Sequence, residues 1–153
     1  MPSAMTIEKY AENLCLKGAL EEEAERSMKK AADEEHIAAG VQLEETVECN
    51  AMFDGTWRKR GFSSLQGGVT VISALTGKCL DYETLNKSCP GFSRWQSKLL
   101  TKENQKWLAA HKCSINFTGS APAMEPEGVK RIFSRSETKN NLQYTGCIGD
   151  GDS

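Results

Sequence analysis

Three short extended runs joined by tight turns constrain the fold of this chain more than any other feature. They cover residues 47–53, 68–74 and 79–85. In the first run apolar residues alternate with Glu48, Asn50 and Met52, the period-two pattern of a strand with one buried face. A Thr-Gly-Lys turn at 76–78 leads directly from the second run into the third. The pattern predicts three antiparallel strands in a meander.

The second half of the chain adds helices and one more strand. A loop followed by a helical stretch is expected over residues 87–110. Pro126 suits the first turn of a helix over 127–139, which the two asparagines that follow would end. Residues 142–148 indicate a last strand. This order predicts a layer fold of the mixed α/β or α+β kind and excludes a helical bundle or a β-sandwich.

The N-terminal part differs from the rest in charge and periodicity. Residues 1–46 carry 5 basic and 11 acidic side chains, whereas residues 47–153 carry 14 basic and 10 acidic ones. Residues 6–39 have helical apolar spacing, with Gly18 as a break between two helices and Gly40 as the stop. We therefore predict an acidic helical arm at 1–45 that packs on the body or on a partner chain, and a body at 46–153 with a different role.

Several classes of protein are excluded by what the 153 residues lack. No run approaches 18 consecutive apolar residues, so no membrane-spanning helix and no membrane partner are expected. The N-terminus has neither the basic start nor the apolar stretch of a secretory signal. The six cysteines are therefore expected in a reducing compartment, with Cys49, Cys79 and Cys147 as small buried hydrophobic residues.

Two aspartates occupy matching positions at predicted strand ends. Asp54 follows the first strand and Asp150 the last one, and each has a glycine neighbour. Carboxylates at the ends of neighbouring strands can hold Mg²⁺ ions that activate a hydroxyl and stabilise a leaving oxygen. Asp152 could replace or assist Asp150. The alternative is that Asp-Gly is simply a common turn, and spacing alone leaves both interpretations open.

A second group of candidate ligands lies in the middle of the chain. His111 and Cys113 are two residues apart, which places both side chains on one face of an extended segment, and Cys89 could be a third zinc ligand. A closed structural zinc site needs a fourth ligand, and Phe92 stands where a Cys-x-x-Cys pair would supply it. The alternative is a surface histidine beside a buried cysteine.

A short basic segment directly follows Asp54. Arg58, Lys59 and Arg60 come after Trp57, an arrangement that suits phosphate contacts and base stacking in DNA binding. The alternative is a solvated loop with Trp57 packed into the core. Three basic residues are too few to identify a nuclear import signal.

Read together, these motifs resemble a known family. Its blocks are Phe-Asp-Gly-Thr-Trp at 53–57, His-Lys-Cys at 111–113, Ala-Met-Glu at 123–125 and Gly-Asp-Gly-Asp-Ser at 149–153. The string resembles the Mutator-like transposase domain over about residues 47–153. The resemblance implies a ribonuclease-H-like core with metal ligands at Asp54 and at Asp150 or Asp152. It also implies Mg²⁺ or Mn²⁺ as cofactors, DNA as the partner, a nuclear location, and cutting and joining of DNA by two-metal phosphoryl transfer. It leaves homo-oligomer formation open.

Two departures from the family pattern shape the prediction. A third acidic ligand is expected downstream of Ser153, so we expect the ribonuclease-H-like core to be incomplete at its C-terminus and this chain to be inactive alone. In relatives a Cys-x-x-Cys before the His-x-Cys implies a zinc site in an insertion at about 86–118. Phe92 occupies the second cysteine position here, so Zn²⁺ binding by Cys89, His111 and Cys113 stays open. The competing function is a non-catalytic DNA- or partner-binding protein derived from a transposable element.

Overall fold

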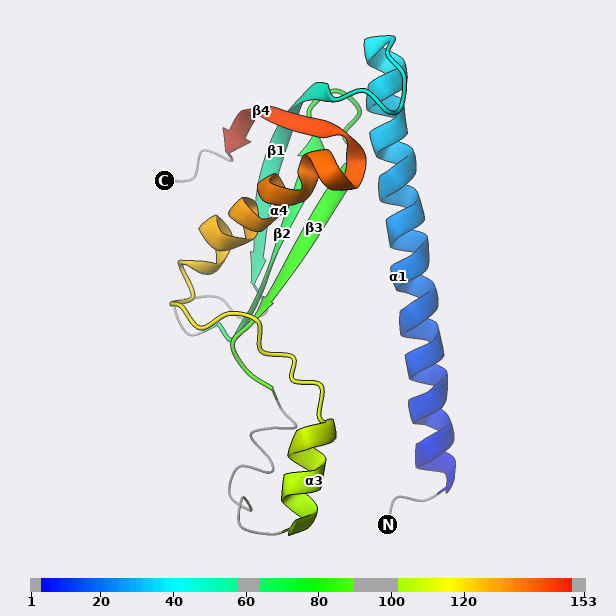
Figure 1. The fold of residues 1–153 in the computed structure, drawn as a ribbon, viewed down its shortest axis with the longest axis vertical. Helices are drawn as coiled ribbons and strands as arrows, with labels where there is room; N and C mark the ends of the chain where they lie inside the picture. Colours follow the sequence, from blue (N-terminus) through cyan, green and yellow to red (C-terminus); the bar gives the residue numbers. More distant parts are fainter. Residues whose placement is uncertain (1–3, 58–63, 90–101, 150–153) are drawn as a thin grey trace.

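The structure is a computed structural model that describes residues 4–57, 64–89 and 102–149. Its strands form one four-stranded sheet in the order β3-β2-β1-β4, and helix α4 lies across one face of it (Figure 1). The strands are β1 (Val47–Trp57), β2 (Gln66–Ser73), β3 (Cys79–Asn86) and β4 (Leu142–Gly149), and the helices are α1 (Ala4–Ala39), α3 (Lys102–Ala110) and α4 (Met124–Asn140). The predicted mixed α/β class is therefore confirmed.

The sheet joins an antiparallel meander to one parallel strand. β1 pairs with β2 and β2 with β3, both antiparallel, as the alternation predicted. Gly77, with φ +69°, supplies the left-handed residue of the turn before β3. The last strand, β4, lies parallel to β1, from the pair Val47–Leu142 to the pair Phe53–Gly149, with an irregularity after Cys49. The C-terminal ends of β1 and β4 therefore point toward the same end of the sheet.

Helix α4 covers the sheet and encloses the core. Ile132 is fully buried, and the ring of Phe133 stacks on Phe53 of β1 with centroids 5.3 Å apart. Gly128 lets the helix approach β2 closely, because an added Cβ would lie 2.6 Å from a methyl carbon of Val69. The helix ends at Asn141 in the left-handed conformation, as the asparagine pair predicted.

Helix α1 is continuous, so the predicted break at Gly18 is wrong. Nothing lies within 4 Å of an added Cβ at Gly18, and a single glycine costs a helix only about 1 kcal/mol among strong helix formers. The helix ends at Gly40, φ +70°, as predicted. Figure 1 shows α1 running beside the β3 edge and on past the end of the sheet. In its C-terminal part Ala31 and Ala32 are buried in the core.

Buried polar groups help to dock α1 on the sheet. The Glu35 carboxylate accepts hydrogen bonds from the Ser73 hydroxyl and, at 3.5 Å, from the Cys49 thiol. Burial, with the nearby charge of Glu35, raises the pKa of Cys49 to about 12, so this thiol stays protonated and can donate. Both ring nitrogens of His36 lie within 3.0 Å of backbone carbonyls, those of Ala32 and Glu45. The arm therefore packs on the body, while its boundary as a separate domain stays a prediction.

Two other sequence predictions have definite outcomes here. Cys49 is buried as predicted, but Cys79 is exposed at the start of β3, where the chain leaves the turn, so that prediction is wrong. The side chain of Cys147 lies outside the described part. No helix in the described ranges combines the length and the hydropathy that crossing a bilayer requires.

Candidate functional site

Asp54 lies within β1 and not at its end. The strand continues for three more residues to Trp57, which pairs with Gly67 of β2, so the predicted strand end is wrong. The reason lies in packing: an added Cβ at Gly67 would lie 2.5 Å from a ring carbon of Trp57, which shows that the indole covers this glycine. That contact favours an extended chain beyond the Asp-Gly pair over a turn.

The pleat of β1 points Asp54 away from α4. Phe53 is buried against α4, and successive side chains of a strand point to opposite faces, so Asp54 belongs to the face that α4 does not cover. Its side chain is exposed, and within the described ranges its carboxylate has no ion-pair partner. Its backbone carbonyl accepts a hydrogen bond from the Thr70 hydroxyl at 3.3 Å. A free carboxylate oxygen on an open face is what a hard divalent cation requires.

The pairing of β4 with β1 aligns the residue before the second predicted acidic block with the residue before the first. Phe53, the residue before Asp54, pairs with Gly149, the residue before Asp150. Asp150 and Asp152 themselves lie outside the described residues. The neighbouring strands that the prediction required are thus present, while the convergence of the two carboxylates stays a prediction.

An acidic residue that the sequence analysis did not single out lies at the same end of β1. Glu125, in the first turn of α4, packs against Gly55, and an added Cβ at Gly55 would lie 3.1 Å from two atoms of its carboxyl group. Glu125 lies on the face that α4 covers, whereas Asp54 belongs to the other face. Two signals were available: the Ala-Met-Glu block at 123–125, and a glycine next to an aspartate, which allows a close approach.

A polar groove of about 500 Å³ lies between this end of the sheet and α1. Thr56 lines it and shares a face with Asp54, about 7 Å further along the strand. Its other lining residues are Lys17, Gln66, Gly67, Gly68, Thr84, Asn86 and Ser114. The lining consists of hydroxyl, amide and glycine groups with one lysine, so the groove suits a polar ligand.

The predicted DNA-binding segment is described only at its first residue. Trp57 is half-buried and packs against Gly67, where the sulfur of Met124 also lies 3.1 Å from an added Cβ. Arg58, Lys59 and Arg60 lie outside the described residues. The packing of Trp57 agrees with the alternative interpretation, in which this ring belongs to the fold.

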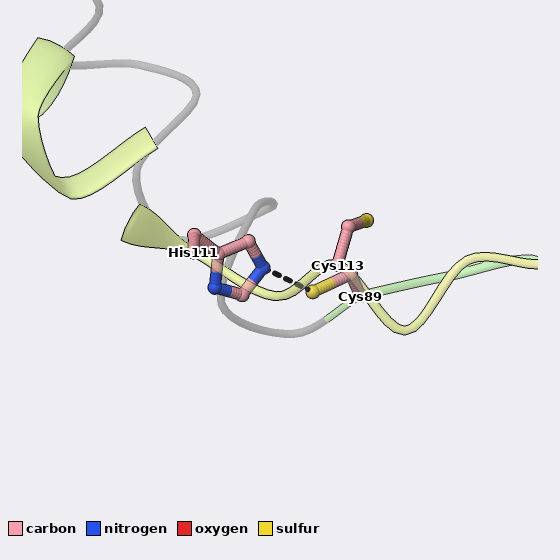
Figure 2. A group of neighbouring side chains, drawn as sticks. All are labelled: Cys89, His111 and Cys113. Atoms are coloured by element: carbon pink, nitrogen blue, oxygen red, sulfur yellow. Dashed lines mark hydrogen bonds between the residues drawn. The ribbon is translucent and has the colours of Figure 1, made fainter. Parts of the chain in front are cut away.

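The structure brings together all three predicted zinc ligands, Cys89, His111 and Cys113. Their donor atoms lie within 4.8 Å of one another, and Nε2 of His111 lies 3.0 Å from Sγ of Cys89 (Figure 2). Cys89 is buried with 4% of its surface exposed, His111 is half-buried and Cys113 is exposed. Tetrahedral zinc with two thiolates and an imidazole would separate these donors by about 3.5–3.8 Å, so the three residues fit that ion.

Trp107 is a neighbour of this cluster that the sequence analysis passed over. Its indole stacks on the His111 ring with centroids 4.1 Å apart and an interplanar angle of 17°. The two residues are four apart, at the end of α3 and just beyond it, which is the helical spacing for side-chain contact. The stack restricts the plane of the imidazole, whose Nε2 faces Sγ of Cys89.

Comparison with known proteins settles the family. The family model described as Mutator-like transposase matches residues 1–153, the whole chain. The chain belongs to the Mutator-like transposase family. No curated protein and no solved structure matches it. The resemblance drawn from the motifs is therefore confirmed, and the match extends over α1 as well as the sheet.

In this transposase-family chain a second aspartate of the sheet has a structural role that was missed. Asp81 of β3 is 1% exposed and accepts hydrogen bonds from Arg135 at 2.8 and 3.1 Å and from Lys139 at 2.9 Å. Burial alone would raise the pKa of Asp81, but the hydrogen bonds and charges of Arg135 and Lys139 lower it below its ordinary value of 3.8. Arg135 also binds Glu83, the next residue of β3 on this face.

Proposed function

We propose that this chain forms the first part of a metal-dependent DNA transposase core, with Asp54 as the first ligand of catalytic Mg²⁺ or Mn²⁺. Membership of a transposase family supports the reaction class. The single observation that carries the site assignment is the parallel pairing of β1 with β4 up to Phe53 and Gly149. Each of these residues directly precedes one of the predicted acidic ligands.

The placement of Asp54 supports a ligand role over a structural one. Its carboxylate is exposed on the face that α4 leaves uncovered, and no positive side chain of the described residues neutralises it. Asp150 follows Gly149 in the sequence and is the proposed second ligand, and its position lies outside the described residues.

The bound metal ions would supply activation of a water or hydroxyl and stabilisation of the leaving oxygen. The chain's own residues would hold those ions and orient the DNA. The groove beside Thr56 lies at this end of the sheet and offers hydroxyl and amide groups for a phosphodiester backbone. A ribonuclease-H-like fold is part of this proposal, supported by a meander followed by a helix and a parallel strand.

The first test measures Mn²⁺ binding by the chain with and without the Asp54 carboxylate. Asp54→Asn should weaken Mn²⁺ binding, measured by calorimetry or electron spin resonance, at least about tenfold, because an amide oxygen lacks the negative charge. Glu48→Gln is the matched control, since Glu48 is an exposed carboxylate on the same face of β1, six residues away. Equal affinity in the Asp54 variant and the control would contradict the assignment.

The second test separates catalysis from simple DNA binding. In a full-length transposase that contains this chain, Asp54→Asn and Asp150→Asn should abolish cleavage of transposon-end DNA while DNA binding persists. Asp152→Asn shows whether Asp152 replaces or assists Asp150. DNA binding without cleavage by the unmutated full-length protein would favour the competing function, a non-catalytic binding protein derived from a transposable element.

A further inference from the structure

The Cys89, His111 and Cys113 cluster joins segments on both sides of the α3 insertion. Cys89 lies three residues after the end of β3, and His111 and Cys113 directly follow α3. The donors of these residues converge within 4.8 Å although 22 residues separate Cys89 from His111. No other group of three or more such donors was found in the described part of the chain. None of the three residues is a proposed transposase metal ligand, although Ser114, next to Cys113, lines the groove beside Thr56.

The insertion offers only three suitable ligands. Over residues 86–118 the sequence contains one other cysteine, histidine or acidic side chain, Glu103. Glu103 lies near the start of α3, seven residues before its last residue Ala110, so the helical rise places it about 10 Å from the end of the helix that His111 follows. Residues 90–101, next to Cys89 in sequence, include no cysteine, histidine or carboxylate at all. A fourth ligand from within the insertion is therefore missing.

Burial shows which side of the cluster is open. Cys89 is 4% exposed and His111 is half-buried, whereas Cys113 is exposed. The His111 ring stacks on Trp107, and its Nε2 lies 3.0 Å from Sγ of Cys89. Two donors thus lie on the protein side, and solvent reaches the cluster on the side of Cys113.

We propose that Cys89, His111 and Cys113 bind one zinc ion whose fourth coordination position is open to exogenous ligands. Both thiols lose their protons to solvent when the ion binds. A water molecule fills the fourth position, and a soft monodentate ligand such as a small thiol can replace it, entering as thiolate and releasing its own proton. The ion fastens the end of α3 to the segment that follows β3.

Zinc content tests the ligand set. The purified chain should hold one zinc per molecule by native mass spectrometry. Cys113→Ser should weaken zinc binding at least about tenfold, since even loss of a residue that only supports a ligand costs 10–100-fold. Cys79→Ser is the control, because Cys79 is also an exposed cysteine but lies outside the cluster. Equal zinc affinity in the two variants would overturn the proposed site.

Cobalt substitution tests the open position. With Co²⁺ in place of zinc, added 2-mercaptoethanol should change the visible absorption spectrum in a saturable way. Phe92→Cys, which creates a Cys-x-x-Cys pair with Cys89, should close the site, tighten metal binding and remove the response to thiol. Phe92 lies outside the described residues, so this variant uses only its spacing from Cys89.

Ser97→Cys is the control for that variant, because it adds a thiol eight residues from Cys89, beyond the usual ligand spacing. It should leave the thiol response intact. A cobalt-loaded wild-type protein whose spectrum does not respond to thiol would overturn the open position. It would show that another part of the chain, or a second copy, completes the coordination.

Discussion

An aspartate on one face of the sheet is buried and paired, whereas an aspartate on the other face is exposed. On the face that α4 covers, Asp81 is 1% exposed and is bound by Arg135 and Lys139. On the other face Asp54 is exposed and has no ion-pair partner among the described residues. Asp81 therefore stabilises the packing of α4 on the sheet, whereas the carboxylate oxygens of Asp54 remain accessible. The comparison shows that coverage by α4, and not residue type, decides whether an aspartate of this sheet is buried and paired or exposed.

The energetic basis of this difference is desolvation. A buried carboxylate costs several kcal/mol unless charged partners and hydrogen bonds compensate, and Asp81 receives both from α4. An exposed carboxylate keeps its hydration and needs no partner, so Asp54 can exchange water for a metal ion at little cost to the fold.

The largest effect is expected from Asp81→Asn. The variant removes the charge that Arg135 and Lys139 both face, so the free energy of unfolding should fall by about 3 kcal/mol, the lower end for broken buried pairs because both partners are partly exposed. Urea denaturation followed by circular dichroism measures the change. A loss below about 1 kcal/mol would mean that this network does not hold α4 on the sheet.

Glycine substitutions compare the packing of the two faces directly. Gly128→Ala would place a Cβ 2.6 Å from Val69 and 3.1 Å from Leu85, so α4 must shift, and a loss of about 1–2 kcal/mol is expected. Gly68→Ala meets nothing nearer than 3.7 Å and should leave stability unchanged. Thermal melts of both variants provide the measurement. Equal melting temperatures would contradict the tight packing of α4 on β2.

Acid should lower the free energy of unfolding through protonation of Asp81, on the face that α4 covers. The pKa of Asp81 is lower in the folded chain than its ordinary value of 3.8, so the folded state binds fewer protons and the stabilisation is complete above that value. This stabilisation is lost as the pH falls through the lowered pKa. While Asp81 is only partly protonated, the loss of stability in the wild type is smaller than the loss caused by Asp81→Asn. Urea midpoints between pH 6 and pH 2.5 should fall less in Asp81→Asn than in the wild type. Parallel curves would assign the acid sensitivity to other groups.

The smallest effect on stability is expected from Asp54→Asn. Because the side chain is exposed and unpaired among the described residues, the free energy of unfolding should change by less than about 0.5 kcal/mol. The same variant should lose Mn²⁺ binding, which separates a functional role from a structural one. A stability loss as large as that of Asp81→Asn would remove the distinction between the two faces.

Part of the candidate site could be predicted from local pattern alone. The spacing of His111 and Cys113 indicated two candidate zinc ligands because two residues in an extended segment share a face, and the structure places their donor atoms close together. The Asp81 network was missed, although Asp81 and Glu83 alternate on β3 while Arg131, Arg135 and Lys139 recur every four residues on α4. Each of these charge patterns is common on a strand or a helix. The acidic residues meet the basic residues only because α4 packs across β3.

The sequence by itself determined the strands of the meander, helix α4, the last strand and the family, because periodicity, turn residues and motifs are properties of local sequence. Only the tertiary structure decided that α1 is one helix docked through Glu35, and that β1 continues past Asp54. It also decided that Cys89 meets His111, and that Asp54 and Asp81 lie on opposite faces. These outcomes depend on contacts between residues distant in the chain, and the energy of such contacts appears only when the elements pack.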